Sequence, residues 1–113
     1  MIKISDTATI ALNLSTMAPF TGPNFSGRPG NADTDAMGSH ILGWGEHIRE
    51  SAAAARYTVW SYDTAIAWTG DGVNWTILAD NPGRQTTAKH FSAVRSALGS
   101  LTGITLTEIH KSA

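Results

Sequence analysis

The stretch RYTVWSYDTAIAWTGDGVNWTILA, residues 56–79, decides the fold of this chain. It is rich in β-branched and aromatic residues, which are favoured in strands. It divides into three predicted strands, at 56–62, 65–69 and 74–79. Asp63-Thr64 supplies the first turn, and Gly70-Asp71-Gly72 supplies a second, tight turn that needs a positive φ. The stretch therefore predicts an antiparallel three-strand meander.

The second turn carries a recognisable motif, Thr69-Gly70-Asp71-Gly72-Val73-Asn74-Trp75-Thr76. It resembles the Asp-box hairpins of sialidase-like repeats, which run Ser/Thr-x-Asp-Gly-x-x-Trp-Thr. The resemblance implies that Asp71 accepts hydrogen bonds from turn amides and that Trp75 packs beneath the turn. Its role is structural, so it implies nothing about sugar binding.

A helix and a further strand are predicted after the meander. Thr86 or Thr87 is the expected N-cap, and Gly99 lies where a C′ glycine is expected. The apolar stripe of this helix consists of Ala88, Phe91, Val94 and Leu98. Alternation over residues 104–109 predicts an added strand. The result is an α+β fold, a small, mostly antiparallel sheet with edge strands beside the 56–79 meander, packed against one or two helices.

Three elements are predicted before the meander. Partial alternation over Thr7–Leu14 indicates a strand, and the prolines and glycines of residues 17–35 indicate a long loop pinned by Phe20 and Phe25. An apolar stripe predicts a helix over Ala36–Ala55, which its glycines weaken so that it is firm only from about Gly45. We expect residues 1–113 to form a single domain.

Composition narrows the classes of function. The chain has 8 Lys+Arg against 9 Asp+Glu, a net charge of -1, which argues against a dedicated nucleic-acid binder. It has no cysteine, and no apolar run approaches the length of a membrane span. The N-terminal residues lack the pattern of a signal peptide. A soluble, intracellular protein without membrane contact is the expectation.

No arrangement in the sequence predicts catalysis. His40 and His47 are too far apart along a helix to share a metal ion, and no nucleophile motif is present. We therefore expect no enzyme activity, no cofactor and no metal site. A hydrolase built on His90 and Asp63 would require the two to meet in a closed pocket.

Two sets of residues are candidates for binding. Trp60, Trp68 and Trp75 fall on successive strands, where they either form the core facing the helices, which we favour, or stack bases. The polar candidates are Tyr62, Arg84, Thr87, Lys89, His90 and Arg95. His90 is expected on the exposed side of its helix beside Lys89, although one turn into the helix its ring could also bond to the Ser61-Tyr62 turn.

The segments Ser61-Tyr62-Asp63-Thr64-Ala65-Ile66-Ala67, Thr86-Thr87-Ala88-Lys89-His90 and Val94-Arg95 carry a resemblance to a known family. They resemble a family of small, uncharacterised proteins from tailed phages of actinobacteria, over about residues 57–98. Ala65 stands where that family is expected to have proline. The family has no activity that could be transferred to this chain.

The leading hypothesis is a small, non-enzymatic phage accessory protein in the cytoplasm of the infected bacterial host. It would act by binding another, unidentified protein, with a host factor as one candidate. The alternative is a small nucleic-acid-binding module that uses the Trp/Tyr sheet face with Arg84, Lys89 and Arg95. Exposed aromatic residues would favour a symmetric homodimer.

Overall fold

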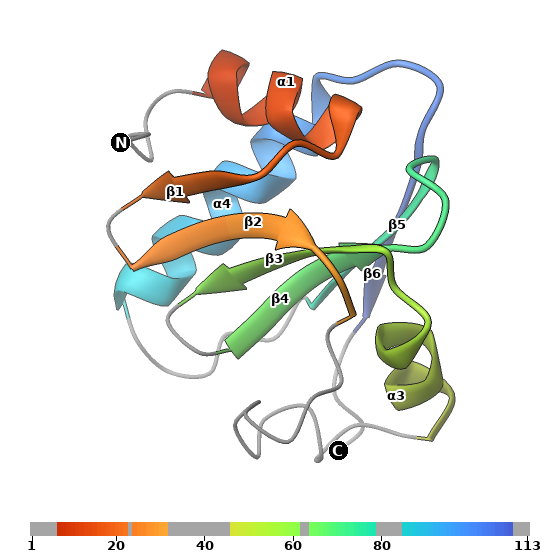
Figure 1. Cartoon of the computed structure of the whole chain (residues 1–113). Coiled ribbons are helices and arrows are strands. Elements are labelled where there is room, and N and C mark those ends of the chain that lie inside the picture. The colour runs from red at the N-terminus through yellow and green to blue at the C-terminus, as the bar shows by residue number, and fades with distance from the viewer. Residues whose placement is uncertain (1–6, 23, 32–45, 62–63, 79–84, 110–113) are drawn as a thin grey trace.

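The sheet and the helices are seen in a computed structural model that describes residues 7–22, 24–31, 46–61, 64–78 and 85–109 (Figure 1). In chain order the elements are α1 (Thr7–Thr16), β1 (Phe20–Gly22), β2 (Phe25–Pro29), α3 (Glu46–Ala53), β3 (Tyr57–Ser61), β4 (Thr64–Thr69), β5 (Asn74–Leu78), α4 (Gln85–Gly99) and β6 (Thr105–Ile109). This is the α+β fold that the sequence predicts.

Six strands form one open sheet in the order in which they occur along the described chain. The pairs from β1 to β5 are antiparallel, and β6 pairs with β5 in parallel. The register of β3 and β4 shifts by one residue, since Val59 lies opposite Ala67 while Trp60 lies opposite Ala65. Ile66 is therefore the extra residue of a β-bulge. The predicted meander is confirmed, and it forms the centre of the sheet.

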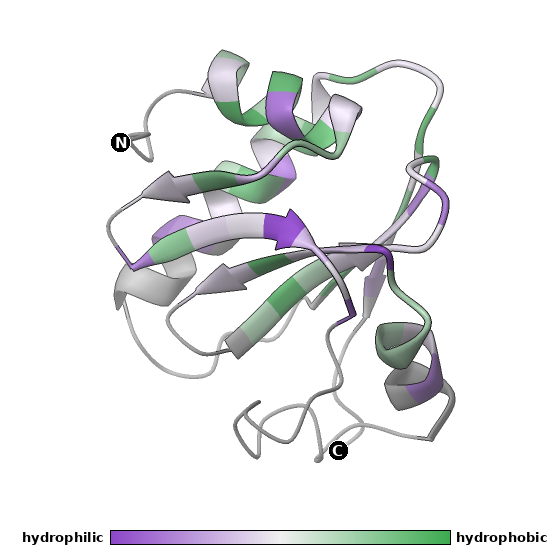
Figure 2. Cartoon of the chain, viewed as in Figure 1, coloured by the Kyte–Doolittle hydropathy of each residue, from purple (hydrophilic) through white to green (hydrophobic). Residues whose placement is uncertain are grey.

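Both faces of the central strands are covered. Successive side chains of a strand point to opposite faces, and all five residues of β3 are buried. On one face, Tyr57 donates from its hydroxyl to the Ala18 carbonyl just after α1, at 2.7 Å. On the other, Trp68 donates from Nε1 to Ser51 Oγ in α3, at 3.0 Å. α1 and α4 thus cover one face and α3 packs on the other; Figure 2 shows hydrophobic residues midway along β3 and β4.

Residues 7–16 form a helix, so the predicted strand over Thr7–Leu14 is wrong. Ile10, Ala11 and Leu14 are buried, at helical spacing, whereas Leu12 is 63% exposed. The alternation of Ile10, Leu12 and Leu14 fits a strand equally well along the sequence. Packing of α1 against α4 on one side of the sheet selects the helical stripe (Figure 1).

The predicted loop over residues 17–35 contains a hairpin, which corrects that prediction for its described part. Phe20 lies opposite Gly27, and Gly22 opposite Phe25, beside a turn in which Asn24 has a φ of 56°. Pro19 precedes β1 and Pro29 ends β2, positions at which a strand tolerates proline. Phe20 and Phe25 are buried, as the sequence predicts.

The remaining helices differ from expectation at their ends. The start of the predicted 36–55 helix, residues 36–45, lies outside the described residues, and α3 confirms the helix over Glu46–Ala53. α4 begins at Gln85 and includes Gly99, which is not among the glycines with a positive φ. Gly99 is therefore no left-handed C′ residue. β6 confirms the added strand.

The turn between β4 and β5 has the hydrogen bonds that the Asp-box resemblance implies. The Asp71 carboxylate accepts from Val73 N at 2.8 Å, from Asn74 N at 2.7 Å and from Asn74 Nδ2 at 2.7 Å. The bonds from the backbone and side chain of Asn74, followed by that from Val73, lower the Asp71 pKa to about 2. Gly72 supplies a φ of 81°, and Trp75 is buried and donates from Nε1 to the Gly72 carbonyl at 3.3 Å. The turn is thus fixed by local bonds.

Candidate functional site

His90 lies in the core, which corrects the expectation that it occupies the exposed side of its helix. Its side chain is 2% exposed, and its Nδ1 lies 2.6 Å from Ser61 Oγ on β3. The ring stacks on Phe25 with centroids 4.9 Å apart and planes at 17°. Burial lowers the pKa of the imidazole. The bond to the Ser61 end of the turn, which the sequence suggests, is confirmed and links α4 to the sheet.

A hydroxyl bonded to an imidazole is also the arrangement of a nucleophile with its base. Ser61 is only 1% exposed, so substrate has no access to its oxygen in this conformation. Asp63, the other residue of the hydrolase considered from sequence, lies outside the described residues. The Ser61–His90 pair therefore acts as a buried polar contact between β3 and α4.

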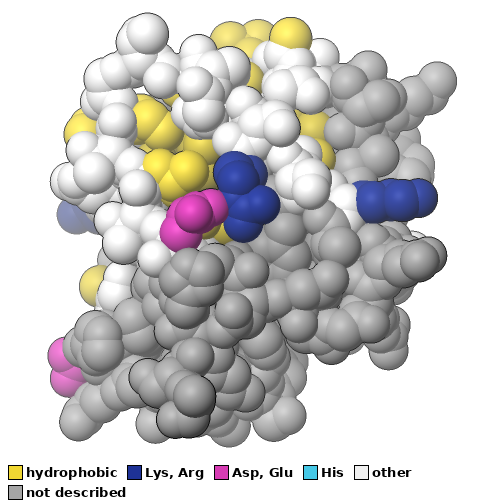
Figure 3. All heavy atoms as spheres, turned by 180° about the vertical axis from the view of Figure 1, so that it is seen from behind, with side chains coloured by type: hydrophobic (Ala, Val, Ile, Leu, Met, Phe, Trp, Pro, Cys, Tyr) yellow, Lys and Arg dark blue, Asp and Glu magenta, His cyan; other side chains and the backbone are white. Residues whose placement is uncertain are grey.

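The polar candidates do not form one exposed patch in the described part of the chain. Tyr62 and Arg84 lie outside it, as does the side chain of Thr87. Lys89 is exposed on α4, while Arg95 donates from Nε to Glu108 on β6 as an ion pair, with both side chains 42% exposed. Figure 3 shows the cationic side chains of this face apart from one another, one of them beside an acidic side chain.

The three tryptophans of the meander belong to the core, as favoured from the sequence. Trp68 and Trp75 are each 1% exposed and Trp60 is 6% exposed. Trp68 lies opposite Thr58, and Trp75 lies opposite Thr69. Because Trp68 and Thr69 are consecutive residues of β4, Trp68 and Trp75 point to opposite faces of the sheet. No exposed ring among the three is available for stacking on a base.

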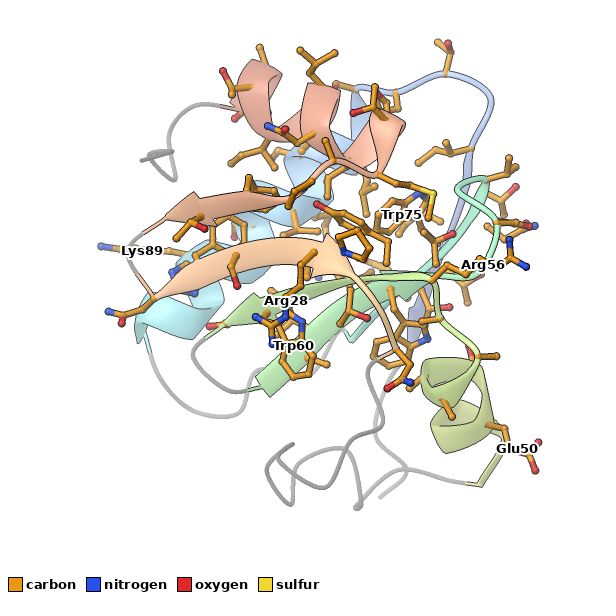
Figure 4. The ribbon with its side chains drawn as sticks, in the orientation of Figure 1. Arg28, Glu50, Arg56, Trp60, Trp75 and Lys89 are labelled. Carbon is orange, nitrogen blue, oxygen red and sulfur yellow. The ribbon has the colours of Figure 1, made fainter. Side chains whose placement is uncertain are left out.

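Trp60 differs from the other two tryptophans in its hydrogen bonding. Trp68 and Trp75 donate to acceptors, whereas Trp60 Nε1 is the buried side-chain polar atom, among those described, that has no partner. The Arg28 guanidinium lies over the Trp60 ring with its Cζ 4.7 Å from the ring centroid. Figure 4 shows the two side chains together beside β2 and β3. This corner of the sheet therefore concentrates hydrogen-bond donors.

Arg28 is not among the candidate residues that the sequence indicates. Its side chain is exposed and forms no ion pair with any described carboxylate. It lies in β2 opposite Thr58, on the face that carries Trp60, while Ser26 lies opposite Trp60 itself. The alternation of Phe25 and Gly27 with the polar Ser26 and Arg28 was the available signal in the sequence, hidden by the prolines around it.

Contact with the indole restricts the guanidinium, and because Arg28 is exposed its N–H donors remain accessible to a ligand from solvent. The planar edge of these donors matches the two oxygens of a carboxylate or phosphate. We therefore name Arg28 and Trp60 the Arg28–Trp60 site. It can bind an anionic group through Arg28, with the buried ring as support.

The described helices include none that is long and apolar enough to cross a membrane. The described residues also include no group of three or more His, Asp or Glu placed to hold a metal ion. Comparison of the chain with protein-family models, with curated proteins and with solved structures finds no match in any of the three.

Proposed function

We propose that this chain is a small, non-enzymatic accessory protein of a tailed phage that binds a protein of the bacterial host through the Arg28–Trp60 site. The observation that carries the proposal is the exposed Arg28 guanidinium, held over a buried indole without an ion-pair partner among the described residues. Arginine and tryptophan are enriched among residues that dominate the energy of protein interfaces. The partner would present a carboxylate-bearing surface.

The buried Ser61–His90 pair supports binding over catalysis. A nucleophile and its base must reach a substrate, and these two side chains are 1% and 2% exposed. Their contact instead anchors α4 to β3. A rigid sheet behind the Arg28–Trp60 site reduces the conformational entropy that binding would cost.

The nucleic-acid alternative keeps some of its cations but loses its stacking surface. Of its three cations, Lys89 is exposed, Arg95 is paired with Glu108 and Arg84 lies outside the described residues, while the three tryptophans are buried. Binding through these cations alone would be weak, non-specific and strongly dependent on salt. Nucleic-acid binding is therefore the less favoured function, and the capture experiment distinguishes it from protein binding.

The test is affinity capture of the tagged chain from nuclease-treated bacterial lysate, with four versions compared side by side. Wild type, Arg28→Ala, Arg28→Lys and Arg56→Ala are used, since Arg56 is also exposed, and Figure 4 shows it on another part of the surface. We expect one host protein to be recovered by wild type and by Arg56→Ala. Its recovery should fall about tenfold or more with Arg28→Ala.

Arg28→Lys keeps the charge but loses the planar fork, so recovery between the two extremes is expected. Equal loss with Arg28→Ala and Arg56→Ala would show a general charge effect and contradict the proposed site. Recovery of nucleic-acid-associated proteins alone, in a parallel capture from lysate without nuclease, and their loss when nuclease is added would favour the nucleic-acid alternative.

A further inference from the structure

The two edges of the sheet are protected to different degrees. β1 forms one edge and has three residues, with Pro19 before it and Pro23 next after it in the sequence. Short length and proline are two of the ways in which proteins prevent pairing at an edge. β6 forms the other edge and has five residues, Thr-Leu-Thr-Glu-Ile, without proline or lysine. Its pairing with β5 runs without a register shift.

The hydrogen-bonding directions of β6 follow from its contact with β5. Thr105 donates its backbone N–H to the Val73 carbonyl at 2.8 Å. Backbone groups of successive residues in a strand point alternately to its two sides. Leu106 and Glu108 therefore direct their N–H and C=O groups away from β5, where no other described strand is paired with them.

The charge on this edge is already balanced. Glu108 is the acidic residue of β6 and forms the ion pair with Arg95 of α4. Thr105 and Thr107 are exposed and Leu106 is half-buried. A regular strand with hydroxyl-bearing, β-branched side chains and no free charge is suited to pairing with another strand.

We propose that β6 pairs antiparallel with β6 of a second copy of this chain, about a two-fold axis through Thr107. In this register Leu106 of each copy lies opposite Glu108 of the other copy. The backbone N–H and C=O groups that point away from β5 therefore form hydrogen bonds between the two copies. Thr107 lies opposite Thr107 on the axis, a pair that stabilises sheets.

The neighbouring registers are less favourable. An axis through Glu108 would place two carboxylates directly opposite each other, which destabilises a pair of strands. With an axis through Leu106, the residues of β6 that follow Thr107 would lie opposite residues outside β6 of the other copy. A register shifted by a single residue would place residues whose backbone N–H and C=O groups point towards the other copy opposite residues whose groups point towards β5. Pairing about Thr107 alone aligns residues 105–109 along their whole length.

The proposal stands independently of the Arg28–Trp60 site, which lies on β2 and β3. It also replaces the reason for dimerisation given from the sequence, since the described aromatic side chains of the meander are buried. A strand pair alone buries less than a standard interface. We therefore expect a weak dimer with a dissociation constant on the order of micromolar.

Sedimentation equilibrium of the full chain over a range of concentrations tests the proposal. Wild type should pass from monomer to dimer. Thr107→Lys and Thr107→Glu should each weaken the dimer by at least about tenfold, because each places like charges on the axis. An equimolar mixture of the two variants should restore association. Thr105→Lys is the matched control, with the same charge on the same strand but opposite residue 109.

Urea denaturation should show that these exposed substitutions leave the fold intact. Wild type that stays monomeric throughout would overturn the proposal and leave the edge for a strand of another protein. Equal effects of Thr105→Lys and Thr107→Lys would overturn the two-fold axis at Thr107. Thr107→Lys should leave capture through Arg28 unchanged, so the two proposals can fail separately.

Discussion

Substitution of Gly27 by alanine tests the packing between the β1–β2 hairpin and β3. A Cβ at this position would overlap Phe20 Cε1 and the Tyr57 hydroxyl oxygen, and would lie 2.9 Å from Phe20 Cδ1. Phe20 is 5% exposed and Tyr57 is 0% exposed, so neither ring has free space to move into. Either the hairpin shifts away from β3 or the hydrogen bond from Tyr57 to the Ala18 carbonyl is lost.

The expected loss of stability follows from these contacts. Overpacking of a core costs about 1–3 kcal/mol, and a lost hydrogen bond about 1 kcal/mol. The reduced entropy of the unfolded chain offsets about 0.4–1 kcal/mol. The free energy of unfolding should therefore fall by about 2 kcal/mol, and the urea midpoint by about 1 M. Tryptophan fluorescence is a suitable probe, because the ring of Trp75 lies 5.9 Å from that of Tyr57.

Two further variants separate this effect from a general intolerance of alanine. A Cβ added at Gly99 would have no atom within 4 Å, and this glycine has no positive φ, so Gly99→Ala should stabilise α4 by up to about 1 kcal/mol. Tyr57→Phe removes one of the overlapping atoms, so it should cost less in the Gly27→Ala background than alone. A Gly27→Ala midpoint equal to that of wild type would refute the packing described here.

The other predictions concern Asp71, His90 and the tryptophans. Asp71→Asn should lower stability at neutral pH, and the difference should shrink as pH falls from about 4 towards 2, because bonding to the turn lowers this pKa to about 2; urea midpoints against pH measure it. Burial lowers the His90 pKa, so the folded chain binds fewer protons than the unfolded chain. Stability should then fall as pH drops below about 6.5, and less so in His90→Phe; equal pH dependence would contradict this. In thermal melts, Trp68→Phe should cost about 1 kcal/mol more than Trp60→Phe, because only Trp68 loses a hydrogen bond, to Ser51.

Local sequence was enough to predict the meander, α4 and β6. The turn around Asp71 shows why, since its bonds join residues no more than three positions apart. The helical stripe of α4 is likewise a local pattern, and its Val94 and Leu98 are buried as predicted. Such features require no knowledge of distant parts of the chain.

The candidate site could not be predicted in the same way, because it joins residues that are distant in the sequence. Arg28 meets Trp60 only because β2 pairs with β3 in a particular register. His90 turns into the core because Ser61 and Phe25 lie beneath α4.

The sequence by itself determined the strands and the tight turn of the meander and the strand β6, because alternation and turn chemistry act over a few residues. Only the tertiary structure decided that α1 is a helix. Ile10 and Leu14 fit the spacing of a strand and that of a helix, and packing of α1 against α4 selects the helix. It also decided that β2, in the proline-rich segment, pairs with β3 and that β6 runs parallel to β5. The reason is that the burial each of these strands gains depends on the strand next to it in the sheet.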